Sequence, residues 1–170
     1  MTKGIRRAGK TLKDAERRRL AKRSRSEYPV PGTEYSVPAG WALLWCDGGS
    51  RGNPGPAAYA FVIETEDGAV VASAAEAIGV ATVGTAEYRA LVAGLEAAVA
   101  LGLDRVEVRT DSRLVAAQMG ASPPPLRNPR LSELRDRALE LHRRIGTVTF
   151  RWIPGERNSR ADELVSTLLF

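Results

Sequence analysis

The sequence predicts one α/β domain built on a five-stranded mixed sheet, with three strands in an antiparallel meander, two parallel strands, and helices on both faces. Three apolar segments joined by turns come first, and helical and strand patterns then alternate to the end of the chain. A chain of 170 residues is long enough for one domain with a core and short for two. Its hydrophobic fraction of 44% and charged fraction of 26% are ordinary for a globular protein.

The meander is predicted from three segments rich in apolar residues. The first, 41–47, is a short apolar run that ends in an acid, as a buried strand does where it emerges at a sheet edge. Glycine and proline over 48–56 predict a turn. Two further strands are expected over 57–65 and 69–79, joined by a hairpin-type turn at 66–68.

The second half of the domain alternates between helical and strand patterns. A helix is predicted over 86–101, closed by Gly102 as a C-terminal cap. The remaining elements follow in order: a strand over 105–111, a short helix over 111–120, a proline-rich connection over 121–129, an amphipathic helix over 131–146, a strand over 147–154, and a terminal helix capped near Asn158 or Ser159.

Charge divides the chain into a basic N-terminal arm, 1–40, and a domain, 41–170. The arm holds eleven Lys and Arg against four acids, a net charge of +7, whereas the domain holds fourteen against sixteen, a net charge of −2. The arm is poor in apolar groups and ends in a Pro/Gly linker, so it is expected to be disordered. Two interpretations stay open: a solubilising arm, and an arm that binds phosphates without sequence preference.

Several function classes are excluded by composition. No run of about 18 apolar residues is present, and no apolar segment follows the basic start, so neither a membrane span nor a secretory signal is expected. The single cysteine, Cys46, excludes an intramolecular disulfide and a cysteine-cluster metal site, and is interpreted as a core residue. We therefore expect a cytoplasmic monomer with no obligatory protein partner.

Four acids occupy positions where the predicted elements would meet. Asp47 ends the first strand and Asp111 the fourth, so neighbouring parallel strands would bring both side chains to one sheet edge. Glu87 is predicted in the first turn of its helix and Asp162 near the start of the last, each on the apolar face. Taken singly, each acid is explained by a turn or by the helix dipole.

Taken together, the same acids predict a metal site. Clustered carboxylates repel and raise one another's pKa unless a cation neutralises them. Oxygen donors with no Cys or His nearby suit Mg²⁺ or Mn²⁺ rather than zinc. Two such ions about 3.5–4 Å apart are the usual device for in-line attack on a phosphodiester.

Four segments resemble type 1 ribonuclease H and occur in that family's order: WCDGGSRGNPGPAAYAFVI its first hairpin, TAEYRALVAGLEAA its first long helix, RTDSRLVAAQM its strand-to-helix junction, and WIPGERNSRADELV its C-terminal acid motif. They are spread along the domain 41–170, from residue 45 to residue 165. The resemblance implies a ribonuclease H-like fold and an enzyme that cleaves the RNA strand of RNA–DNA hybrids, leaving 5′-phosphate and 3′-hydroxyl ends.

The resemblance also implies roles for individual residues. Asp47, Glu87, Asp111 and Asp162 would be the catalytic acids and would hold two Mg²⁺ ions, with Mn²⁺ as a substitute. Asp47 would bridge the ions, with Glu87 and Asp111 on one side and Asp162 on the other. Contacts to the nucleic acid are predicted at Gly48, Gly49, Ser50, Arg51, Asn53 and Gly84.

The chain departs from the family pattern at three places. Val83 and Gly84 stand where the family usually has two asparagines that contact the hybrid. The side-chain contacts of those asparagines are therefore lost, and only the backbone amide of Gly84 remains as a donor to the hybrid. The only histidine, His142, lies on a predicted helix, so the histidine that many members carry before the final acid is absent. One amphipathic helix fills 130–145, without the basic handle helix of some relatives.

Two alternatives belong to other functional classes. One is a related nuclease of the same fold with relaxed specificity, acting on duplex RNA or DNA junctions; the Asp-Gly-Gly-Ser hairpin argues against it. The other is a non-catalytic module that binds hybrids. The four acids argue against the latter, because clustered anions facing phosphates weaken binding.

Overall fold

The computed structural model describes residues 39–170, so the predictions for the basic arm, except its last two residues, lie outside the described part of the chain. Its elements are β1 (Ala42–Ser50), β2 (Gly55–Thr65), β3 (Val70–Ala81), α3 (Val83–Ala100), β4 (Arg105–Thr110), α4 (Arg113–Gln118), α5 (Pro129–Ile145), β5 (Thr147–Trp152), the short 3-10 helix η1 (Gly155–Arg157) and α6 (Ser159–Leu169).

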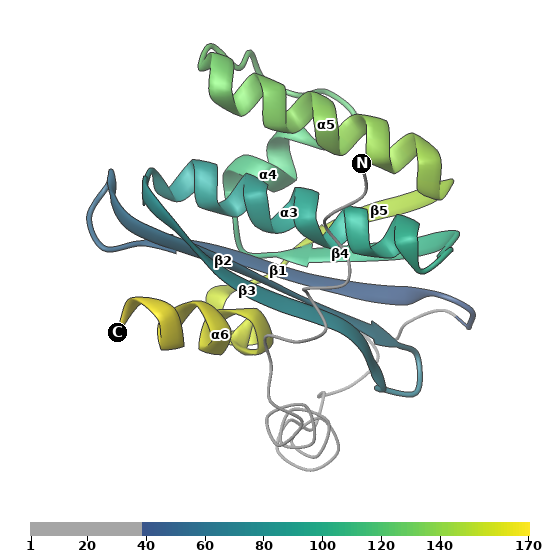
Figure 1. Ribbon diagram of the computed structural model, residues 1–170. Helices are drawn as coiled ribbons and strands as arrows, with labels where there is room; N and C mark the ends of the chain where they lie inside the picture. Colours follow the sequence, from purple (N-terminus) through teal and green to yellow (C-terminus); the bar gives the residue numbers. More distant parts are fainter. Residues whose placement is uncertain (1–38) are drawn as a thin grey trace.

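A single five-stranded sheet organises the described residues, in the order β3-β2-β1-β4-β5. The pairs β1–β2 and β2–β3 are antiparallel, and the pairs β1–β4 and β4–β5 are parallel. In Figure 1, α3, α4 and α5 lie on one side of this sheet and α6 lies on the other. The predicted mixed sheet, with a three-stranded meander and helices on both faces, is confirmed.

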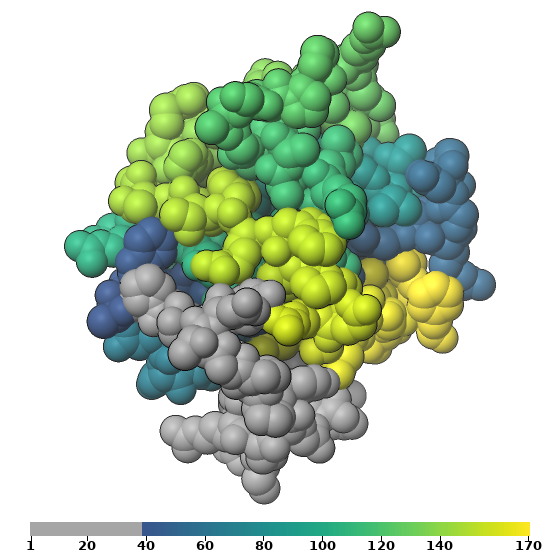
Figure 2. All heavy atoms as spheres, turned by 180° about the vertical axis from the view of Figure 1, so that it is seen from behind, coloured from purple at the N-terminus to yellow at the C-terminus, as the bar shows by residue number. Residues whose placement is uncertain are grey.

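Side chains that alternate along the strands fill two cores, one on each face of the sheet. Leu44 and Val108 face α3 and join the larger core with Leu91 and Leu95 of that helix. On the opposite face, apolar strand residues pack under α6 and the segment that leads into it: Leu43, Trp45, Ala58, Ala60 and Val62 against Ile153, Ala161, Val165 and Leu169. Figure 2 shows the molecule from behind, where the segment after β5 crosses the middle of the surface, below the green of α4 and α5 and next to the yellow of α6.

The β1–β2 turn is shorter than predicted. Gly48, Gly49 and Ser50 continue β1 by pairing with 57–59 of β2, which leaves only 51–54 for the turn. The long ladder holds the glycines extended, although their composition is typical of a loop.

The first long helix begins earlier than predicted, at Val83 instead of 86. Thr82 caps it, because its Oγ1 accepts a hydrogen bond from the Thr85 amide at 3.2 Å. Glu87 therefore lies in the second turn of α3, and the prediction that places it in the first turn is wrong. The predicted end is confirmed, since Gly102 adopts a positive φ of 69° just after the C-cap.

None of the helices within 39–170 has the length and apolar character needed to cross a membrane. The helix α5 is continuous over 129–145 and carries His142 in its last turn, so the basic handle helix is absent from this part of the chain, as predicted.

Candidate functional site

Two of the four predicted acids reach the same sheet edge. Trp45 of β1 pairs with Arg109 of β4 in the parallel register, and Asp47 and Asp111 each lie two residues further along. Asp111 directly follows the last residue of β4. The expectation that the two parallel strands bring these acids to one edge agrees with the register.

Gly48 brings the third acid close by allowing α3 to pack against β1. A Cβ built on Gly48 would lie 2.2 Å from the Ala86 carbonyl carbon and 2.3 Å from the Glu87 nitrogen. Only a residue without a side chain permits this approach of strand and helix backbones. Because Asp47 precedes Gly48, the close packing determines how Glu87 is placed relative to Asp47.

Ser112 links Glu87 to the β4–α4 junction. Its Oγ donates a hydrogen bond to Glu87 Oε2 at 2.6 Å and accepts one from the Val115 amide at 3.1 Å. The same hydroxyl therefore caps α4 and orients the Glu87 carboxylate beside Asp111.

Asn158 connects the start of α6 to the same edge. Its side chain is fully buried, and Nδ2 donates to the Cys46 carbonyl at 2.9 Å and to Asp111 Oδ1 at 3.0 Å. Its backbone carbonyl accepts a hydrogen bond from the Asp162 amide at 3.1 Å. Asp162 itself is exposed in the first turn of α6.

The acids interact electrostatically. Burial, together with the charges of Asp111, Asp162 and Glu87, raises the pKa of Asp47 to about 8. Burial also raises the pKa of Glu87; the Ser112 hydrogen bond lowers it and the Asp111 charge adds to the rise. The predicted mutual effect on these pKa values is therefore present for Asp47 and Glu87.

The donor chemistry suits a divalent cation, although the side chains do not converge to ligating distance. Within 39–170, no three Asp, Glu, His or Cys side chains form a group that could hold a metal ion as they stand. Burial and, after it, the negative charges of the neighbouring carboxylates raise the pKa of Asp47 to about 8. A bound cation would offset these negative charges, so the oxygen donors of the four carboxylates are of the kind that Mg²⁺ or Mn²⁺ prefers. Their assignment as ligands stays a prediction.

The glycines predicted to contact RNA have a packing explanation. Gly48 is buried against the α3 backbone, and a Cβ on Gly49 would lie 3.1 Å from Val165 Cγ1 and 3.2 Å from Leu169 Cδ1. Ser50 donates its hydroxyl to the Ala81 carbonyl at 3.0 Å. Contact of these three positions with RNA remains a prediction, and burial makes it least favourable for Gly48.

The other predicted contact residues lie nearer the surface. Arg51 is exposed, with its guanidinium 5.8 Å from the Phe170 ring centroid. Asn53 is exposed and accepts a hydrogen bond from the Val83 amide at 3.2 Å, which joins the β1–β2 turn to the start of α3. The Gly84 amide has no acceptor among residues 39–170, so it is available to a ligand.

An aromatic–cation pair beside Asp111 was not predicted. Trp152 is 41% exposed, and its Nε1 donates to the Asp111 carbonyl at 3.1 Å. The Arg113 guanidinium lies 4.7 Å from its ring centroid. Ser112 and Asn158 were also missed as site residues, although one follows Asp111 and the other precedes Asp162 by one helical turn.

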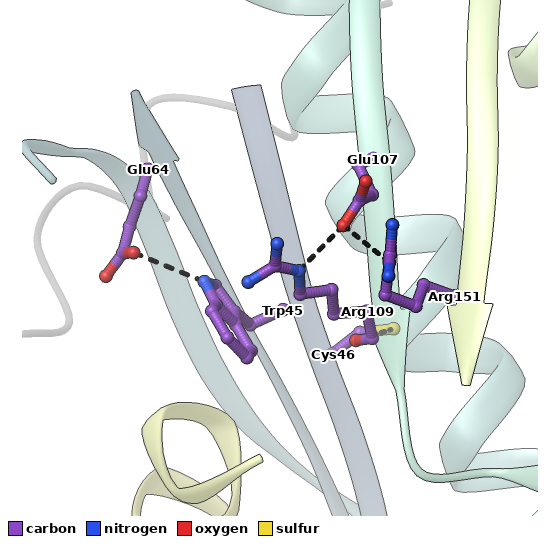
Figure 3. A network of polar contacts seen from close by, with 6 residues as sticks. All are labelled: Trp45, Cys46, Glu64, Glu107, Arg109 and Arg151. Atoms are coloured by element: carbon purple, nitrogen blue, oxygen red, sulfur yellow. Dashed lines mark hydrogen bonds and ion pairs between the residues drawn. The ribbon is translucent and has the colours of Figure 1, made fainter. Parts of the chain in front are cut away.

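Behind the site, ion pairs on the α6 face connect the central strands (Figure 3). Glu107 Oε1 accepts from Arg109 Nε at 2.8 Å and pairs with Arg151 Nε at 3.2 Å, which joins β4 to β5. Trp45 is 8% exposed and donates Nε1 to Glu64 Oε2 at 3.2 Å. Its packing role is therefore combined with a buried polar contact that joins β1 to β2.

Cys46 lies in the larger core and is 1% exposed. Burial raises the pKa of its thiol, and the charge of Asp47 raises it further. The thiol is thus held in its neutral form, which agrees with its interpretation as a core residue.

Known proteins resemble the chain in sequence. The family model described as "Reverse transcriptase-like" matches residues 45–167. The "Bifunctional protein Rv2228c" of Mycobacterium tuberculosis is 44% identical over 125 residues, which are 73% of this chain and 34% of that protein. The chain thus matches about a third of the length of this relative.

Solved structures resemble the chain in fold as well as sequence. RNase H1 from Halobacterium salinarum has a TM-score of 0.70 and 42% identity, covering 75% of this chain and 96% of that one. LC11-RNase H1, solved in complex with an RNA/DNA hybrid, has a TM-score of 0.69 and 37% identity, covering 74% and 94%.

Proposed function

Because the chain belongs to the reverse transcriptase-like family and has the ribonuclease H fold, we propose that it is a ribonuclease H that hydrolyses the RNA strand of RNA–DNA hybrids. The observation that carries the proposal is the gathering of the acids around the parallel ends of β1 and β4, where Ser112 holds Glu87 and Asn158 links Asp111 to the start of α6. A binding module would gain nothing from clustered carboxylates that repel phosphate. The similar LC11 protein was solved with an RNA/DNA hybrid, which supports this substrate class.

The chemistry we propose is metal-dependent hydrolysis by these four acids. Two divalent cations held there would supply an activated water and stabilise the leaving 3′ oxygen. Water oxygen joins phosphorus and the bond to the 3′ oxygen breaks, so the products carry 5′-phosphate and 3′-hydroxyl ends.

The protein's own residues prepare the site for this reaction. Ser112 orients Glu87 through its 2.6 Å hydrogen bond, and the close packing at Gly48 keeps Glu87 near Asp47. With a pKa of about 8, Asp47 is mostly protonated at neutral pH, and a bound cation would favour its ionised form.

We assign recognition of the hybrid to the surface around the β1–β2 turn and the start of α3. Arg51 and Asn53 are exposed there, and the Gly84 amide is free to donate to a phosphate or a 2′-hydroxyl. Without side-chain amides at 83 and 84, discrimination depends on backbone contacts and on the shape of the minor groove. We add Trp152 and Arg113 to this surface, because Trp152 donates to the Asp111 carbonyl and the Arg113 guanidinium lies over its ring.

The proposal is tested with labelled RNA–DNA hybrid, duplex RNA and duplex DNA, each with Mg²⁺, Mn²⁺ or EDTA. We expect metal-dependent cleavage of the RNA strand in the hybrid alone. Asp47→Asn should lower the rate by about a hundredfold or more, while Asp104→Asn, an exposed acid in the turn before β4, should cleave normally.

Two results would contradict the proposal. Equal cleavage of duplex RNA or DNA would favour a nuclease of relaxed specificity. Tight hybrid binding with no turnover in either metal would favour a non-catalytic module.

A further inference from the structure

Asn158 is a fully buried amide whose orientation is determined by its neighbours. Nδ2 lies within hydrogen-bond distance of two acceptors, the Cys46 carbonyl and Asp111 Oδ1. Turning the amide over would set its own carbonyl oxygen against both acceptors, which is unfavourable. Asn158 therefore acts as a double donor toward the acidic edge.

Asn158 forms hydrogen bonds with, or directly next to, three of the four acids. Cys46 is the backbone neighbour of Asp47, and Asp111 is contacted directly. The Asn158 carbonyl accepts the amide of Asp162 from the first turn of α6. Through the hydrogen bonds of its side chain and its backbone, Asn158 joins β1, the end of β4 and the start of α6.

Asn158 makes these contacts instead of the usual bond of a helix cap. It is the N-cap of α6, where an asparagine side chain ordinarily accepts from an amide of the first turn. Its side chain makes no such bond, and Oδ1 is buried without a hydrogen-bond partner within the described chain. Helix capping alone does not explain the residue, because the side chain is directed at Asp111 and β1.

The 3-10 helix η1, directly before Asn158, limits the movement of Asp111 from its other side. A Cβ built on Gly155 would lie 3.2 Å from Asp111 Oδ2. One carboxylate oxygen is thus held by Asn158 and the other faces the Gly155 backbone. The segment 155–158 therefore fixes the direction in which Asp111 points.

We propose that Asn158 is a positioning residue that sets Asp47, Asp111 and Asp162 in the relative arrangement that binds divalent cations. The inference rests on the proposed function only in taking these acids as cation ligands. Without the Nδ2 donor, repulsion among the carboxylates turns Asp111 away, and cation affinity falls. Loss of such a supporting contact typically costs about 10–100-fold in metal affinity.

The test compares Asn158→Leu with Gln118→Leu in the full chain. Both variants replace a buried amide by an apolar group of similar size, and Gln118 makes its amide contacts with Pro124 and Arg135, away from the acids. Mn²⁺ binding is measured by calorimetry, and thermal unfolding is measured in EDTA. We expect both variants to melt at lower temperature, with Mn²⁺ affinity about tenfold or more weaker only in Asn158→Leu.

A conservative variant provides a further readout. Asn158→Ser retains one donor and should recover part of the lost Mn²⁺ affinity. Unchanged affinity in Asn158→Leu, or an equal loss in Gln118→Leu, would overturn the inference and leave Asn158 a structural residue. Calorimetry needs no substrate, so it tests the role of Asn158 independently of cleavage. An unaltered protein that binds Mn²⁺ but cleaves no hybrid would refute the proposed function, and the Mn²⁺ affinities of the variants would still show whether Asn158 is a positioning residue. An unaltered protein that binds no Mn²⁺ would overturn both.

Discussion

Replacement of Gly48 by alanine should separate the backbones of β1 and α3 at the acidic site. The added Cβ would lie 2.2–2.5 Å from carbonyl and amide atoms of Ala86 and Glu87, and real Cβ contacts are essentially never shorter than 3.0 Å. The helix must therefore recede by about 0.8 Å or more, because backbone atoms cannot turn aside as a side chain can. Overpacking of this kind costs roughly 3 kcal/mol, at the upper end of the usual range.

The loss should appear in both stability and activity. For a domain of this size, about 3 kcal/mol corresponds to a fall in melting temperature of roughly 10 °C. Since Glu87 moves with α3, hybrid cleavage should fall by up to about a hundredfold, as expected for a displacement near 1 Å. Differential scanning calorimetry and steady-state cleavage of a labelled hybrid measure the two effects.

Gly49→Ala is the matched control for Gly48→Ala. Its Cβ would meet only the Val165 and Leu169 methyl groups, at 3.1 and 3.2 Å, which can shift by a few tenths of an ångström. We expect a cost of about 1 kcal/mol or less and nearly normal cleavage. If Gly48→Ala melts like the unaltered protein but binds hybrid weakly, the glycine serves contact with RNA, as the sequence suggests, and the packing argument is refuted.

Three further predictions concern charge, support of Glu87 and the arm. In EDTA, the free energy of unfolding should fall as pH rises from about 4 to 8, because folded Asp47 keeps a proton that the unfolded chain releases. Asp47→Asn should flatten this dependence in urea unfolding, and identical slopes in the two proteins would contradict it. Ser112→Ala and Asn128→Ala each remove an N-cap worth about 1 kcal/mol, but only the first should slow cleavage, by about tenfold, because only Ser112 holds Glu87. Equal rates for the two variants would remove Ser112 from the site. Deleting 1–38 should weaken hybrid binding at about 50 mM salt and reduce the salt dependence of affinity, measured by fluorescence anisotropy, without changing the melting temperature. An unchanged salt dependence would favour the solubilising arm.

The order of elements and the edge that carries the acids were predictable because both depend on local patterns. Apolar runs mark β1 and β4, and an acid at the end of each run places Asp47 and Asp111 wherever the two strands lie side by side in parallel. The start of α3 was missed for a local reason too. Val83 and Gly84 are poor helix formers, so the helical pattern becomes visible only from Ala86, whereas the Thr82 cap and the Asn53 contact start the helix at Val83.

What could not be predicted depends on contacts between distant parts of the chain. Gly48 has the composition of a loop residue, and only its approach to the α3 backbone explains why it lacks a side chain. Asn158 has the position of a helix cap, but its amide is used by a carbonyl 112 residues earlier and by a carboxylate 47 residues earlier. A residue type that satisfies a local rule can therefore conceal a second, non-local function. At this site the acids are visible in the sequence, while the groups that fix their relative positions become visible only once β1, β4 and α6 are folded together.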